Sequence, residues 1–250
     1  MSNEYFQFRQ FIVRQEGCAM KVGTDGTLLG AWAELPGAQD SLSSLGSLGT
    51  PWNPRILDIG TGTGLIALMM AQRFPEAEVL GIDIDASAVA QAWENVTASP
   101  FSERIDIREQ DVTKMYDNIG YDTIVSNPPY FVDSLACPDD QRTTARHAVT
   151  LTYDGLMQSA FRLLKDDGRF SIVIPTDSRS AIEAAACLSG FFLSRVCMIR
   201  TTPRKPSKRQ LIEFRKHPVS ELDITEGIIE DSPNVRSTWY QQLTNEFYIK

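Results

Sequence analysis

Two short stretches of the chain carry residue types that can do chemistry. The first is Asn127-Pro128-Pro129-Tyr130, which directly follows the apolar run 121–126. Two consecutive prolines cannot continue a strand, so the chain must turn there. Asn127 and the Pro128 carbonyl can accept both hydrogens of a flat exocyclic amine, and Tyr130 can stack on the ring that carries it. The alternative interpretation is a proline-rich loop without chemistry.

The second stretch is Asp58-Ile59-Gly60-Thr61-Gly62-Thr63-Gly64, which lies between an apolar run and a helical pattern. Glycines such as Gly60 and Gly62 let the backbone approach a ligand closely. Asp83 ends the next predicted strand, where a carboxylate can accept both hydroxyls of a ribose. Asp111 follows the third predicted strand and is placed to reach the adenine amine of the same ligand. It can equally cap the residues that follow it.

The spacing of these residues favours one cofactor class over another. The glycines follow a GxGxG pattern rather than GxGxxG, and Asp58 stands two residues before the first of them. A pyrophosphate at that turn would be repelled by a carboxylate. A sulfonium ligand with a free amino group would be attracted to it, which favours S-adenosylmethionine over a nicotinamide dinucleotide. The alternative role for Asp58 is to cap a helix.

Strands alternate with helices along the rest of the chain, which predicts a doubly wound, Rossmann-like α/β fold with a mostly parallel sheet. Only a basic loop separates the last two predicted strands, so we expect a hairpin and an antiparallel last strand. The seven predicted strands are 55–59, 78–82, 104–108, 121–126, 169–174, 191–199 and 210–216. The predicted helices include 86–98, with Val89 and Trp93 on its buried side, 152–165, stopped by Asp166-Asp167-Gly168, and 178–189.

The region before this sheet has a different character. Alternating apolar residues in 5–13 predict a strand or hairpin, and Thr24 or Asp25 can cap a following helix. Residues 37–53 are rich in Gly, Ser and Leu and are typical of an exposed connector. We therefore predict a single domain over 1–250, with a β/helix extension at 1–36.

Composition excludes several classes of protein. The 250 residues contain no apolar run long enough to span a membrane, and the first residues lack the pattern of a signal peptide, so a cytoplasmic protein is expected. The four cysteines are scattered and there are only two histidines, which argues against a disulfide framework or a metal site. The sequence leaves the oligomeric state open.

The net charge of −8 argues against a uniformly basic surface, but the basic residues cluster locally. One acid-free run holds five of them, and it lies between the last two predicted strands. We interpret it as a loop that contacts RNA phosphates, the alternative being a solvated hairpin tip. The five residues are Arg200, Arg204, Lys205, Lys208 and Arg209.

Taken in order, the motifs resemble those of class I S-adenosylmethionine-dependent methyltransferases that act on amine nitrogens. The stretch 18–26, Cys-Ala-Met-Lys-Val-Gly-Thr-Asp-Gly, narrows the resemblance to the bacterial tRNA1(Val) adenine-37 N6-methyltransferases. Residues 8–11, 28–32 and 145–147, and the ending 247–250, are also similar to that family. The segment 38–50 looks like an insertion.

The resemblance implies transfer of a methyl group to N6 of adenine-37 in the anticodon loop of a valine tRNA. It implies that Asn127, Pro128 and Tyr130 hold the target base. It also implies that Thr24 and Asp25 lie near the methionine end of the cofactor, which Asp58, Gly60, Gly62, Asp83 and Asp111 would bind. Three alternatives remain open: a guanine-N2 methyltransferase of ribosomal RNA, a protein glutamine-N5 methyltransferase, and a non-catalytic RNA-binding module.

Overall fold

The computed structural model describes residues 4–16, 21–37, 53–128 and 151–249. Its centre is an eight-stranded sheet in the order β10-β8-β9-β7-β6-β3-β4-β5. Within this sheet β9 alone runs antiparallel to its neighbours. The strands are β3 (Arg55–Ile59), β4 (Glu78–Asp83), β5 (Ile105–Glu109), β6 (Tyr121–Ser126), β7 (Leu164–Pro175), β8 (Phe192–Arg200), β9 (Arg209–Arg215) and β10 (Asp223–Ile228).

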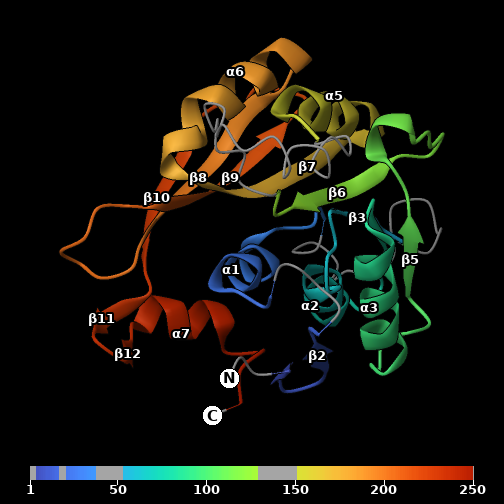
Figure 1. Ribbon diagram of the computed structural model, residues 1–250. Helices are drawn as coiled ribbons and strands as arrows, with labels where there is room; N and C mark the ends of the chain where they lie inside the picture. The colour runs from blue at the N-terminus through green and yellow to red at the C-terminus, as the bar shows by residue number, and fades with distance from the viewer. Residues whose placement is uncertain (1–3, 17–20, 38–52, 129–150, 250) are drawn as a thin grey trace, which may run out of the picture.

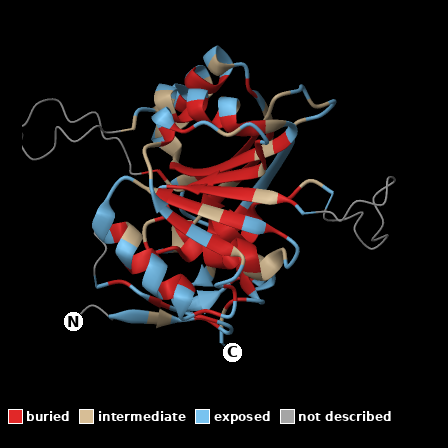
Figure 2. Ribbon diagram, turned by 90° about the vertical axis from the view of Figure 1, so that its right-hand side faces the viewer, coloured by how far each residue is buried: buried red, intermediate tan, exposed pale blue. Residues whose placement is uncertain are grey.

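Helices cover both faces of the sheet, as the alternating pattern predicts (Figure 1). The two groups bury separate apolar clusters, and the central strands between them are mostly buried (Figure 2). One face carries α1 (Thr24–Trp32), α2 (Leu65–Arg73) and α3 (Ala86–Thr97), and the other carries α5 (Tyr153–Leu163) and α6 (Arg179–Ser189). Two short 3-10 helices, η1 (Val112–Lys114) and η2 (Thr176–Ser178), join the larger elements.

The predicted fold class is confirmed, but the strand count of seven is wrong. The hairpin β8–β9 forms as expected, and β9 inserts between β7 and β8. The predicted antiparallel orientation of strand 210–216 is confirmed for β9. It is not the last strand of the sheet, because an eighth strand, β10, pairs in parallel with β8. Strand β10 is followed by the hairpin β11 (Glu230–Ser232) and β12 (Val235–Arg236) and by helix α7 (Thr238–Thr244).

Three local predictions are also wrong. Trp93 is 56% exposed, because α3 buries its small and polar side chains instead. The triplet Asp166-Asp167-Gly168 does not end a helix. Helix α5 ends at Leu163, and the triplet lies inside β7, where the pairing register with β6 shifts. Neither Thr24 nor Asp25 caps α1, whose N-cap is Gly23 with no side-chain hydrogen bond.

The two ends of the described chain pack against each other. The predicted N-terminal hairpin is confirmed as β1 (Tyr5–Gln7) paired with β2 (Ile12–Arg14). The ring of Phe8 stacks on that of Tyr248 with centroids 5.8 Å apart, and the Arg9 N–H donates to the Phe247 carbonyl at 2.8 Å. Most of the predicted connector 37–53 lies outside the described residues.

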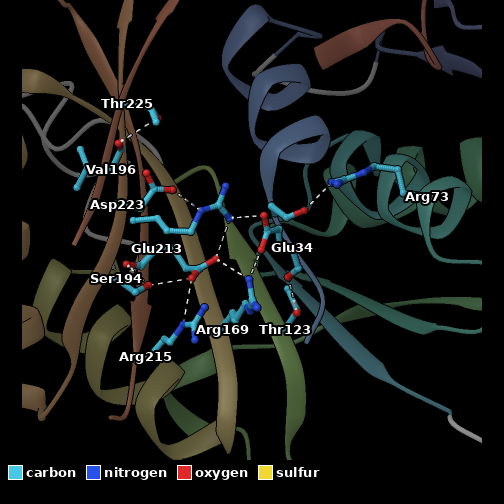
Figure 3. Close-up of polar contacts among 12 residues, drawn as sticks. Glu34, Arg73, Thr123, Arg169, Ser194, Val196, Glu213, Arg215, Asp223 and Thr225 are labelled. Atoms are coloured by element: carbon cyan, nitrogen blue, oxygen red, sulfur yellow. Dashed lines mark hydrogen bonds and ion pairs between the residues drawn. The ribbon is translucent and has the colours of Figure 1, made fainter. Parts of the chain in front are cut away.

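Ion pairs hold α1 at both ends. Beyond its C-terminal end, Glu34 pairs with Arg169 of β7 and with Arg195 of β8, the latter at 3.0 Å (Figure 3). The same arginines meet Glu213 of β9, which is fully buried. At the N-terminal end, Asp25 pairs with the Arg209 guanidinium at 2.9 Å. Helix α1 is therefore fixed along its length against the sheet.

Candidate active site

The predicted chemical residues converge because the strands that carry them end at one edge of the sheet. The strands β3 and β6 are parallel neighbours, with Ile59 opposite Ser126, and the Ser126 hydroxyl donates to the Ile59 carbonyl at 2.9 Å. The chain runs outward from β3 to β4 and β5 on one side, and through β6 to β7 on the other. Such a switch point is where ligands bind in open α/β sheets.

The glycine turn after β3 requires glycine for conformational reasons. Gly60 has φ of 72° and Gly62 has φ of 55°, which L side chains rarely adopt. The N–H groups of Gly60 and Thr61 both donate to the Ile82 carbonyl at 2.9 Å, which ties the turn to β4. A Cβ added to Gly60 would meet no atom within 4 Å, so the space beside this turn is open.

Asp58 is a buried carboxylate beneath the turn. Its Oδ2 accepts from the Thr61 hydroxyl at 2.7 Å and from the Ala67 N–H at 3.2 Å. Its Oδ1 is buried and receives no hydrogen bond from any described residue. Burial raises the pKa of Asp58 from its ordinary 3.8 to about 7, and nearby Asp83 adds to this rise. A buried acceptor in this state is suited to a ligand that brings a positive charge.

The other two predicted cofactor carboxylates differ from each other. Asp83 stands at the end of β4 and accepts from the Gly62 N–H at 3.0 Å, so it lies beside the glycine turn. Asp111 follows β5 and caps η1, where it accepts from the Thr113 N–H and hydroxyl. These bonds, mainly that from the Thr113 hydroxyl, lower the pKa of Asp111. These contacts support the alternative interpretation of Asp111, that it caps the residues that follow it.

Asn127 and Pro128 follow β6 directly and reach the same edge. The Asn127 Oδ1 is buried and has no hydrogen-bond donor within the described part of the chain. Pro128 is buried, which holds the turn against the sheet. Tyr130, the third residue predicted to hold a base, lies outside the described residues. The structure thus brings the amide of the Asn-Pro-Pro-Tyr stretch next to the glycine turn.

Helix α1 begins beside this turn. A Cβ on Gly26 would meet the Leu65 side chain at 3.2 Å, so the first turn of α1 lies against the start of α2. Thr24 and Asp25 are half-buried there. The ion pair from Asp25 to Arg209 joins one predicted cofactor residue to one predicted RNA residue.

The predicted basic loop leaves the sheet at the same edge. Arg200 ends β8 and Arg209 begins β9, and each is paired with a carboxylate, Arg200 with Glu226 at 2.9 Å and Arg209 with Asp25. Arg204, Lys205 and Lys208 are exposed. The last three therefore present the loop's positive charge to solvent.

Sequence reasoning missed two residues that shape the site. The Thr61 hydroxyl holds one oxygen of Asp58, and its position three residues after an aspartate was the available signal. Asn95 of α3 is buried and donates to the Thr63 carbonyl at 2.9 Å and the Arg14 carbonyl at 2.8 Å. It ties the glycine turn to the N-terminal hairpin. Its position on the same helix face as Ala88, Gln91 and Ala92 marks it as inward-facing.

The site fits S-adenosylmethionine. The orphaned Asp58 Oδ1 can receive the amino group of the methionine end, and the glycine turn leaves space for a ligand. Asp83, at the end of the next strand, is placed for ribose hydroxyls. The residues present thus supply acceptors for the amino group and the ribose hydroxyls of that cofactor.

Comparison with known proteins agrees with this geometry. Residues 44–192 match the family Methyltransferase small domain. A predicted O-methyltransferase from Agrobacterium tumefaciens, protein Atu636, superposes with a TM-score of 0.64 at 20% identity, covering 89% of this chain and 96% of that one. A ribosomal protein L11 methylase from Lactobacillus delbrueckii gives 0.51 at 17% identity, covering 81% and 83%. The chain has the fold of a class I S-adenosylmethionine-dependent methyltransferase.

Closer relatives narrow the class to one family. A tRNA1(Val) (adenine(37)-N6)-methyltransferase from Phocaeicola vulgatus is 47% identical over 100% of this chain and 99% of its own length. The protein of that name from Bacteroides thetaiotaomicron is 45% identical with the same coverage. One from Yersinia pestis is 39% identical over 98% and 93%. The chain belongs to the tRNA1(Val) (adenine(37)-N6)-methyltransferase family. In the described part of the chain, no helix combines the length and apolarity needed to cross a membrane.

Proposed function

We propose that this chain methylates N6 of adenine-37 in the anticodon loop of tRNA1(Val). The observation that carries the proposal is the buried Asn127 Oδ1, which no described residue supplies with a hydrogen bond and which lies at the switch point beside the glycine turn. Full-length relatives of one name support the choice of substrate. The same proposal assigns the chain to the cytoplasm, together with its RNA.

Asn127 and Pro128 address the chemical difficulty of the reaction. The exocyclic amine of adenine is a weak nucleophile, because its lone pair is delocalised into the ring. If the Asn127 Oδ1 and the Pro128 carbonyl accept both amine hydrogens, the nitrogen becomes more pyramidal and its lone pair is aimed. This is positioning and stabilisation by fixed dipoles. Tyr130 would stack on the ring, and the proton leaves after the methyl group has moved.

The remaining site residues bind and orient the cofactor. S-adenosylmethionine, when bound, supplies a methyl group on a sulfonium that is a good leaving group. Asp58 would hold the amino group and Asp83 the ribose hydroxyls, while Gly60 and Gly62 allow close approach. Thr24 and Asp25 would lie near the methionine end. Asp111 would reach the adenine amine of the cofactor only with the carboxylate oxygen that does not accept hydrogen bonds from Thr113.

The target base must leave its stack to reach Asn127, which costs a few kcal/mol and less in an unpaired loop. The exposed charges of Arg204, Lys205 and Lys208 would attract the phosphates around it. Arg200 and Arg209 would contribute to RNA binding from their ion pairs with Glu226 and Asp25.

The test is nucleoside mass spectrometry after the purified protein is incubated with labelled S-adenosylmethionine and unmodified tRNA. New N6-methyladenosine in valine tRNA is expected, and a transcript with adenine-37 replaced should remain unlabelled. Label in N2-methylguanosine or in protein glutamine would contradict the proposed substrate and would still support S-adenosylmethionine as the cofactor. If the cofactor binds but neither RNA nor protein becomes labelled, the chain would instead be a non-catalytic RNA-binding module.

A further inference from the structure

A second concave surface lies near the site and has no role in the mechanism above. It is a groove of about 1040 Å³ between the start of α1, helix α7 and the hairpin β11–β12. We call it the α7 groove. Gly23 and Thr24 form one wall, and Arg236, Gln241 and Gln242 belong to the other. Its volume is at the top of the roughly 300–1,000 Å³ typical of small-ligand pockets, so it can hold more than one nucleotide.

The α7 groove adjoins the start of α1 and the basic loop. Thr24, on its wall, adjoins Asp25, which pairs with Arg209 of the basic loop. The hairpin on its other side is tied to the same loop, because the Glu230 N–H donates to the Thr201 carbonyl at 2.9 Å. In Figure 1 the hairpin and α7 lie below the basic loop and beside α1. A strand held by the basic loop can therefore continue into the groove.

The chemistry of the groove suits a nucleic acid. In a chain of net charge −8, the described residues that line the groove include no carboxylate, and Arg236 is their one cation. They offer amides from Gln241 and Gln242, the hydroxyl of Thr238 and the ring of Tyr248. Amides and hydroxyls match base edges and the ribose 2′-hydroxyl, and rings accept stacked bases. No described lining residue carries a negative charge that would repel phosphates, although the Arg236 guanidinium is paired with the neighbouring Glu230 at 3.2 Å.

We propose that the α7 groove binds unpaired nucleotides of the same RNA whose adenine enters the active site. The proposal rests on the proposed function, because it takes the RNA to be the substrate. Gln242 is the best probe of it. This side chain is exposed on α7 and makes no hydrogen bond to any described residue. A charge placed there leaves existing contacts intact.

The experiment compares Gln242→Glu and Gln242→Lys with wild type, using an anticodon stem-loop RNA of the valine tRNA. The expected change is in KM for RNA. Gln242→Glu raises it roughly 3- to 10-fold and Gln242→Lys lowers it, as expected for one charge near a phosphate. Asn118→Asp and Asn118→Lys are the matched controls. Asn118 is exposed just before β6, at the opposite edge of the sheet, so neither control should alter KM.

The outcomes separate this proposal from the proposed function. Wild type that forms N6-methyladenosine, with unchanged KM in both Gln242 variants, overturns the groove and keeps the function. A wild type that methylates no adenine overturns the function, and filter binding of the stem-loop to the same variants then tests the groove. A photoreactive side chain at position 242 should also crosslink to the RNA, and one at position 118 should not. Equal crosslinking at both positions contradicts the proposal.

Discussion

Two side-chain oxygens at the carboxyl edge of the sheet, Asn127 Oδ1 and Asp58 Oδ1, are buried without a hydrogen-bond donor among the residues that the structure describes. A buried acceptor without a partner costs about 1–3 kcal/mol. Two of them at one switch point indicate that a ligand completes their hydrogen bonds. Each oxygen gives a separate expectation, because one faces the proposed base and the other the proposed cofactor.

Asn127→Ala should lower kcat by roughly 10²-fold or more, as expected when a group that stabilises the transition state is removed. Affinity for S-adenosylmethionine, measured by calorimetry, should persist. Asn118→Ala, an exposed asparagine away from the site, is the control and should leave both quantities unchanged. If cofactor affinity falls as far as kcat in Asn127→Ala, the residue belongs to the cofactor pocket instead.

Asp58→Asn should stabilise the free protein while abolishing cofactor binding. The pKa of Asp58 is about 7 when folded and near 3.8 when unfolded, so the unfolded chain loses its proton first as pH rises. The carboxyl therefore favours folding most below pH 4, and this contribution is lost as pH rises to 7. The free energy of unfolding of Asp58→Asn should exceed that of wild type on the order of 2–4 kcal/mol at pH 8, and by little at pH 4.

Denaturant unfolding at the two pH values measures this difference, and calorimetry measures the loss of cofactor binding. A variant less stable than wild type at pH 8 would mean that the charged Asp58 is already compensated in the free protein.

At the scale of the elements, Glu213 links the three strands β7, β8 and β9. It is fully buried and meets Arg169, Arg195 and Arg215, while Ser194 donates to it at 2.8 Å. Glu213→Ala removes the buried carboxylate of this network, although Arg169 and Arg195 keep Glu34, and should lower the free energy of unfolding by roughly 3–5 kcal/mol. Glu183→Ala breaks only the partly exposed pair with Arg179 in α6 and should cost roughly 0.3–0.5 kcal/mol.

Urea unfolding of both variants makes this comparison. A loss in Glu213→Ala no larger than that in Glu183→Ala would show that the buried network adds no net stability. The network would then also not be needed to hold the C-terminal end of α1 against the sheet.

The elements also show what could be predicted from the sequence. Seven strands and the glycine turn follow from apolar runs with clear boundaries. Trp93 was predicted to be buried because its side chain is large and apolar. Helix α3 instead buries Asn95, whose side chain donates to the backbone carbonyls of Arg14 and Thr63. Hydrogen bonds between residues far apart in the chain leave no pattern in the local sequence. Strand β10 was missed because four of its six residues are exposed, so it lacks an apolar run.

The positions of the candidate site residues could be predicted where the residues lie near the end of a strand, and less well elsewhere. Asp58, Asp83 and Asn127 converge because parallel strands end together. The ion pair between Asp25 and Arg209 joins positions far apart in the chain, and neither residue's surroundings reveal the other.

At the scale of the whole molecule, a chain of net charge −8 must attract RNA through local charge. Reversing Arg204 and Lys205 to glutamate should weaken tRNA binding and reduce its salt dependence, because about two phosphate contacts are lost. Cofactor affinity should not change. Arg14→Glu, an exposed charge reversal on β2, is the control. Binding isotherms at several salt concentrations measure the slope, and an unaltered slope would exclude the loop from RNA contact.

The stacking of Phe8 on Tyr248 has a consequence for the order of folding. The hairpin β1–β2 is synthesised long before the surface that covers it. Phe8 therefore lacks its partner Tyr248 while the strands of the central sheet are being made. The nascent chain carries an exposed aromatic cluster until Tyr248 emerges, and chains truncated before Tyr248 should be the ones that aggregate.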